Sequence, residues 1–159
     1  MGRSRLREQL SRREWHALRF RASDPESLAR TLVVRAGAGP QRPLRAERGS
    51  SESLVGGQVR AGRLDVRRLL IEAGSRSGPL HTHRSAENSY LVLEGVVEVR
   101  VGSDRHRLEV GDAIFIPPGI PHATHNPADR RTILLAIYDH PIDDDFELAV
   151  DDGTAAADR

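Results

Sequence analysis

Three histidines have the residue type and spacing of metal ligands. His81 and His83 stand two positions apart, and side chains two apart on a β-strand point to the same face. His122 ends the segment Gly111–His122, in which a strand-like run passes into a turn rich in proline and glycine. This turn is expected to aim His122 back toward the interior. The pattern therefore indicates a site of three imidazoles for a divalent ion.

The segments that must position these histidines read as short β-strands. Valines alternate with charged residues over 96–101, which is typical of a half-buried strand in an antiparallel sheet. Many short strands without intervening helices predict a sandwich or barrel. The segment 37–57 is rich in Gly, Pro, Arg and Ser and predicts an irregular surface segment. The strand-like runs cover residues 64–72, 96–101, 108–110, 113–116 and 132–138.

Composition limits the function further. The chain has 159 residues, which suits one domain, and its net charge of +1 gives no strong field for nucleic acid or an anionic membrane. Cysteine is absent, which excludes disulfides, thiolate metal sites and a cysteine nucleophile. No apolar run reaches membrane-spanning length, and the N-terminus lacks the apolar core of a secretion signal. We expect a soluble cytoplasmic protein without nucleic-acid or membrane partners.

The two ends of the chain differ in charge. Residues 3–21 carry seven arginines and two glutamates, with apolar side chains at a loose helical spacing. We expect short N-terminal helices within 1–36 that pack on the barrel or on a partner subunit; a basic arm that binds a partner is the alternative. The barrel is expected at 54–150. Residues 151–159 are expected to form a flexible acidic tail.

Two segments of the chain resemble the motifs of the cupin superfamily. The first motif is matched at His81, His83 and the closing Gly95, in the run HTHRSAENSYLVLEG. The resemblance implies an all-β, double-stranded β-helix (jelly-roll) barrel that holds the metal inside. It also makes a homodimer the expected assembly. The second motif, G-x5-P-x-G-x2-H-x3-N, is matched at Gly111, Pro117, Gly119, His122 and Asn126.

The chain departs from the family pattern at a ligand position. Counting back from Gly95 as the family does reaches Asn88, whereas Glu87 lies one residue earlier. A slip of one residue turns a strand side chain to the other face. Either Asn88 replaces the carboxylate, or a bulge lets Glu87 reach the metal. With a carboxylate the centre keeps one positive charge on a divalent ion, and with an amide it keeps two.

The resemblance implies a metal-dependent enzyme for a small molecule. His81, His83 and His122 would hold Fe, Ni, Mn or Zn, with Glu87 or Asn88 as the further ligand and Glu87 as a possible general base. Tyr90 and His125 are expected in the substrate pocket. Quercetin dioxygenase-like and polyketide cyclase-like cupins suggest dioxygenase or cyclase/isomerase chemistry on an aromatic or polyketide-like substrate. The alternative is a non-catalytic cupin that binds a small molecule or a structural metal.

Overall fold

In a computed structural model of the chain, residues 33–44, 48–59, 61–142 and 145–149 are described. Eleven strands in this part form two antiparallel sheets, and the one helix among the described residues is a 3₁₀ turn, η1. The predicted N-terminal helices and the acidic tail lie outside the described residues. The elements are β1 (Gln41–Pro43), β2 (Gly49–Val55), η1 (Gly57–Val59), β3 (Asp65–Ile71), β4 (His81–His83), β5 (Asn88–Glu94), β6 (Val96–Val101), β7 (Asp104–Glu109), β8 (Ala113–Ile116), β9 (His122–His125), β10 (Thr132–Tyr138) and β11 (Phe146–Leu148).

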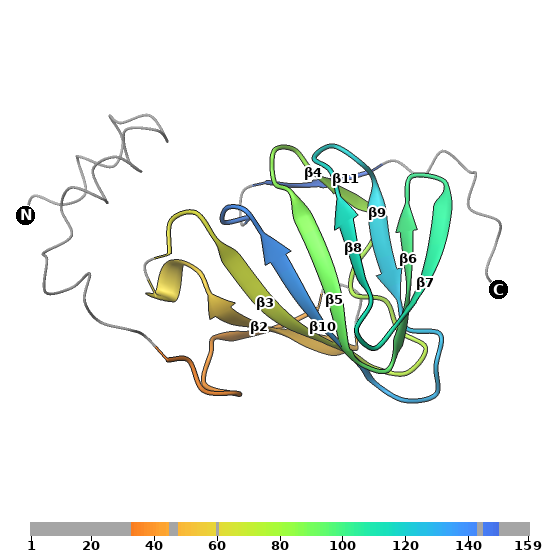
Figure 1. Ribbon diagram of the computed structural model, residues 1–159, viewed down its shortest axis with the longest axis horizontal. Helices are drawn as coiled ribbons and strands as arrows, with labels where there is room; N and C mark the ends of the chain where they lie inside the picture. Colours follow the sequence, from red (N-terminus) through yellow and green to blue (C-terminus); the bar gives the residue numbers. More distant parts are fainter. Residues whose placement is uncertain (1–32, 45–47, 60, 143–144, 150–159) are drawn as a thin grey trace, which may run out of the picture. The chain divides into compact units, whose positions relative to one another are not determined.

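The two sheets face each other across a single core (Figure 1). The larger has the order β1-β2-β3-β10-β5-β8, and the smaller has the order β11-β4-β9-β6-β7. Leu69 and Ile71 of β3 and Val97 and Val99 of β6 belong to this core, and each is at most 6% exposed. Alternate residues of the strands supply the core, as expected for antiparallel sheets with one buried face. The predicted all-β jelly roll is confirmed.

The sequence predicted an irregular surface segment over 37–57. This prediction is wrong, because the segment contains β1 and β2. These strands extend the larger sheet beyond β3, so the sheet starts before residue 54, the expected start of the barrel. Glu52 of β2 is 2% exposed, forms an ion pair with Arg68 of β3 and accepts a 3.0 Å hydrogen bond from Gly39 N. Pairing with β3 therefore overrides the weak local strand propensity of a serine-rich segment.

Glycine and asparagine close the turns that carry the two motifs. Gly95 joins β5 to β6 with a φ of 80°, and a Cβ there would lie 2.6 Å from Thr132 Oγ1, so no other residue fits without strain. Asn126 is fully buried. Its Nδ2 donates to three backbone carbonyls, and its Oδ1 accepts from Ala128 N at 3.0 Å. Asn126 is thus a structural turn residue.

Candidate metal centre

Three imidazoles gather inside the barrel at one end of the sheets. His81 and His83 come from β4 and His122 from β9, and the two strands pair at His81 and His122. One nitrogen of each ring lies within 4.8 Å of the others, and the three side chains are buried. The turn that precedes His122 is tied to β4 by a 2.7 Å hydrogen bond from Gly119 N to His83 O. The two motifs therefore meet at one point.

Hydrogen bonds fix which nitrogen faces that point. His81 Nδ1 lies 2.9 Å from Pro79 O, and His122 Nδ1 lies 2.9 Å from Ile120 O. A carbonyl only accepts, so each Nδ1 carries the proton and donates it. Nε2 of both rings then keeps its lone pair, which is the tautomer that a metal ligand requires.

Burial keeps the imidazoles of His83 and His122 neutral. It lowers the pKa of His83 to about 4, with a further contribution from the neighbouring His122. Burial also lowers the pKa of His122, against a smaller opposite effect of its bond to Ile120 O. A protonated imidazole cannot bind a cation, so a depressed pKa prepares both rings as ligands at neutral pH.

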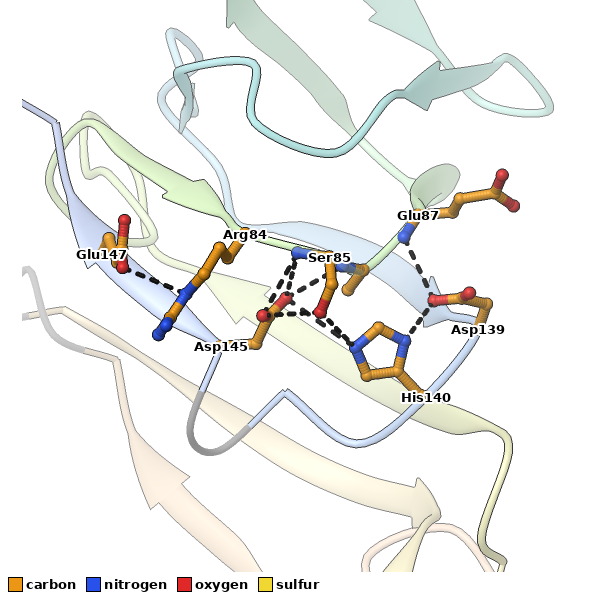
Figure 2. Close-up of polar contacts among 8 residues, drawn as sticks. Arg84, Ser85, Glu87, Asp139, His140, Asp145 and Glu147 are labelled. Carbon is orange, nitrogen blue, oxygen red and sulfur yellow. Dashed lines mark hydrogen bonds and ion pairs between the residues drawn. The ribbon is translucent and has the colours of Figure 1, made fainter. Parts of the chain in front are cut away.

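The structure brings Asn88 to the histidines and leaves Glu87 outside. Asn88 begins β5, is 1% exposed, and its Nδ2 lies 3.2 Å from His122 Nε2. Glu87 is exposed, and its carboxylate points away from the neighbouring polar groups in Figure 2. β5 pairs in regular register with β8 from Asn88 onward, so no bulge turns Glu87 inward. The expected roles of Glu87 as ligand and general base therefore do not agree with its position.

A divalent ion suits the atoms that surround this point. Both ring nitrogens of His83 and Oδ1 of Asn88 are buried without a hydrogen-bond partner. Leaving such groups unpaired costs about 1–3 kcal/mol each. A cation bound between the rings would accept the lone pair of one His83 nitrogen together with the Nε2 lone pairs of His81 and His122. Among the described residues no Asp or Glu joins the group, so its donors are imidazoles and one amide.

The two expected pocket residues have different positions. Tyr90 is 2% exposed, shares the inward face of β5 with Asn88, and its ring centre lies 6.3 Å from that of His122. His125 lies on the opposite face of β9 from His122, and its Nδ1 is 3.8 Å from a Glu98 carboxylate oxygen. The structure brings Tyr90 to the centre and leaves His125 outside the barrel.

A polar network fastens the loop between His83 and Asn88 (Figure 2). Asp145 is 3% exposed and accepts bonds from Ser85 N (3.2 and 3.1 Å), Ser85 Oγ (2.9 Å) and Ala86 N (2.8 Å). Burial alone would raise the pKa of this carboxyl, but the bonds from Ser85 and Ala86 outweigh it and lower the pKa. We call the set Asp139, His140 and Asp145, with the loop residues 84–87 that they hold, the clasp.

His140 of the clasp lies between two acids and a serine. Its Nδ1 is 2.7 Å from Asp139 Oδ1, and its Nε2 is 3.2 Å from Ser85 Oγ. These distances match a Ser-His-Asp triad, yet the Ser85 hydroxyl donates to Asp145, which also takes the N–H groups of Ser85 and Ala86. The N–H groups of Ser85 and Ala86 are therefore not available to bind an oxyanion. The arrangement holds the loop in place and does not activate a nucleophile.

An aromatic ring covers the histidines from β11. Phe146 pairs in register with His83, and its ring stacks on His81 with centres 4.6 Å apart and planes at 21°. On the other side, the Tyr138 ring meets His83 edge-on at 5.2 Å. These rings hold the imidazoles in place. Sequence analysis missed Phe146 and Asp145, since neither belongs to a motif.

Comparison with known proteins agrees with this architecture. A family profile described as the cupin domain matches residues 67–138. This range runs from β3 to β10 and contains His81, His83 and His122. Over these residues the barrel is similar to a cupin domain. Its turns at Gly95 and Asn126 and its buried histidines occupy the two motif segments of that family.

The relatives found are distant in sequence. Quercetin 2,3-dioxygenase of Bacillus subtilis is 29% identical over 72 residues, which cover 44% of this chain and 21% of that protein. An uncharacterised protein of Methanocaldococcus jannaschii is 33% identical over 57 residues, covering 36% and 45%. The chain thus spans less than half of either protein. The polyketide cyclase RemF from Streptomyces resistomycificus aligns with a TM-score of 0.65 at 19% identity, over 77% of this chain and 89% of that one, which supports the fold alone.

A search of the described residues for a helix able to cross a membrane found none.

Proposed function

We propose that the protein is a metal-dependent cupin that binds a divalent ion on His81, His83 and His122 and acts on a small molecule. One observation carries the proposal: three buried imidazoles converge, and the hydrogen bonds of His81 and His122 set the tautomers of these two rings for coordination. Fe, Ni, Mn and Zn all accept imidazole ligands. When bound, such an ion supplies Lewis-acid polarisation or a site for oxygen chemistry.

The residues around the centre support binding of an aromatic or polyketide-like molecule. Tyr90 and Tyr138 line the inward face beside the histidines and are 2% and 4% exposed. Burial raises the pKa of both phenols, so they stay protonated and able to donate a hydrogen bond at neutral pH. Their rings offer flat apolar surfaces with a polar tip, which suits a planar oxygenated substrate. Dioxygenase or cyclase/isomerase chemistry is the reaction class we propose, by analogy with quercetin 2,3-dioxygenase and the polyketide cyclase.

A non-catalytic cupin is the second candidate. It is favoured by the position of Glu87, whose exposed carboxylate leaves the histidine group without a general base among the described residues. In this reading the barrel binds a small molecule or a structural metal without turning it over. A homodimer, expected from the family resemblance, belongs to either proposal.

Metal analysis tests the proposal first. The protein is stripped of metal, loaded with Fe, Ni, Mn or Zn in turn, and the bound metal is measured beside His83→Ala and His122→Ala. About one ion per chain is expected for the wild type and little for either variant. His106→Ala is the matched control, because His106 is exposed on β7 and outside the group. Equal metal content in all four proteins would exclude the site.

Substrate tests then separate the two candidates. The loaded protein is titrated without oxygen with a panel of flavonoid and polyketide-like phenols, and oxygen is then admitted. Product formation that requires the metal supports an enzyme. Ligand binding with neither oxygen uptake nor product supports the binding protein.

A further inference from the structure

We propose that the centre selects anionic ligands, so that its substrate is a small molecule bearing a carboxylate or enolate, because the side chain that completes the histidine group is the amide of Asn88. This inference rests on the proposed function and names the ligand class of the same site. It would make Asn88 the residue that determines ligand charge.

Charge arithmetic at the centre gives the first step. The three imidazoles bring no charge in their neutral form, and an amide brings none whichever of its two polar atoms faces the ion. A divalent ion would keep both positive charges in a site whose four side chains are at most 8% exposed. An uncompensated charge in so dry a place is strongly disfavoured. A ligand that brings negative charge removes that cost.

The surrounding acids do not supply this charge. Asp65 is 3% exposed and binds Arg67 through both carboxylate oxygens, at 2.9 and 2.7 Å. Asp145 is engaged by the backbone and hydroxyl donors of the clasp. Among the described residues, no carboxylate belongs to the histidine group. The Asp145 carboxylate acts on His83 only through space, so no carboxylate of the described residues coordinates an ion there, and a ligand that brings negative charge is favoured.

The amide itself offers a contact to such a ligand. Asn88 Nδ2 lies 3.2 Å from the Nε2 lone pair of His122, and Oδ1 has no partner. When an ion takes that lone pair, the amide is released from His122 and can donate an N–H to an oxygen held beside the ion. A carboxylate at position 88 could only repel that oxygen.

Cobalt-loaded protein tests the inference, because Co²⁺ reports its ligands through its visible spectrum without turnover. Wild type, Asn88→Asp and the control Glu87→Gln are titrated with azide, and with benzoate against neutral benzyl alcohol. Asn88→Asp keeps the shape of the side chain and adds one negative charge, whereas Glu87→Gln changes one charge at an exposed neighbour.

The expected result is a selective loss. Wild type and Glu87→Gln bind azide and benzoate, and benzoate binds at least about tenfold more tightly than benzyl alcohol. Asn88→Asp holds Co²⁺ more tightly and binds both anions about 10- to 1,000-fold more weakly, since one charge about 4 Å away at an effective dielectric of about 20 spans that range.

Three outcomes would count against the inference in distinguishable ways. Equal affinity of the wild type for benzoate and benzyl alcohol overturns the inference. This outcome needs no variant, so the inference can be tested even if Asn88→Asp folds poorly. Unchanged azide affinity in a folded, loaded Asn88→Asp overturns it as well. Failure of wild type to take up Co²⁺, Fe, Ni, Mn or Zn overturns the proposed function together with the inference.

Discussion

Removing the charge of Asp145 tests whether the clasp holds the centre together. The carboxylate accepts bonds from Ser85 N, Ser85 Oγ and Ala86 N while 3% exposed. Asp145→Asn replaces one acceptor oxygen by an NH₂ group that faces a backbone N–H, which leaves at least one buried donor unpaired. Hydrogen bonds to a charged group contribute about 1.5–3 kcal/mol each, and an unpaired buried donor costs about 1–3 kcal/mol. We expect unfolding free energy to fall by about 2–4 kcal/mol.

Urea denaturation at pH 7 measures this change, with Glu147→Gln as the matched control. Glu147 lies two residues away on β11, and its ion pair with Arg84 joins side chains that are 53% and 65% exposed, so its loss is expected to cost less than about 1 kcal/mol. A loss below about 1 kcal/mol in Asp145→Asn, or equal losses in the two variants, would refute the account of the clasp.

The pH dependence of the same variant checks the sign. Because the folded pKa of Asp145 lies below the ordinary 3.8, its contribution is fully present above that value and is lost as pH falls through the lower folded pKa. The stability gap between wild type and Asp145→Asn is therefore expected to close in strong acid. A gap that stays constant down to the acid transition would contradict the cause we assign.

Four more results are expected. Metal affinity, measured by competition with a chelator, should stay nearly constant from pH 8 to about 6 and collapse as pH approaches about 4, the pKa of His83; a midpoint near 6.5 would mean that burial does not depress the pKa. The metal-free protein should lose stability as pH falls from 6.5 toward 4, because the unfolded chain takes up a proton that buried His83 refuses, and thermal melts across this range show it. Phe146→Ala removes the ring stacked on His81 and should weaken metal binding about tenfold, whereas Phe146→Leu should recover part of the affinity in the same chelator assay. Equal metal affinities of the wild type and Phe146→Ala would show that the ring does not position His81. Asn126→Ala should cost about 3 kcal/mol or more in urea, because one buried and two part-buried backbone carbonyls lose the bond from Nδ2, and a loss under about 1 kcal/mol would contradict this.

The fold was predictable because its turns require glycine and asparagine at particular positions of the sequence. Gly111, Gly119 and Asn126 stand at fixed sequence distances from His122. Gly111 and Gly119 have positive φ angles of 94° and 76°. The strand predicted over 132–138 is β10, with the same bounds. Local pattern and global fold agree in these segments.

β1 and β2 were not predictable, since nothing local marks them as strands. Gly49–Val55 reads GSSESLV, and its strand conformation comes from pairing with β3. The tertiary contacts that decide such a segment are absent from any window of the sequence.

The identity of the fourth side chain could be reduced to two residues but not to one. Both parities of β5 are largely apolar beyond Asn88, so alternation does not reveal which of Glu87 and Asn88 points inward. The pairing of Asn88 with Ile116 decides it in the structure. Asp145 was hidden for another reason: it ends a run of three aspartates, and only the loop 84–87 brought against it distinguishes it from its neighbours.

The strand that carries Phe146 has a consequence for the order in which the protein is made. β4 meets β9 only at His81 and His122, whereas all three of its residues pair with β11. When His81, His83 and His122 have left the ribosome but β11 has not, His81 and His83 lie on a three-residue strand. The edge of this strand that later pairs with β11 is still unpaired. The centre reaches its final form when β11 and Asp145 arrive, so metal capture during synthesis is expected to follow emergence of residue 148, well after the last histidine of the group.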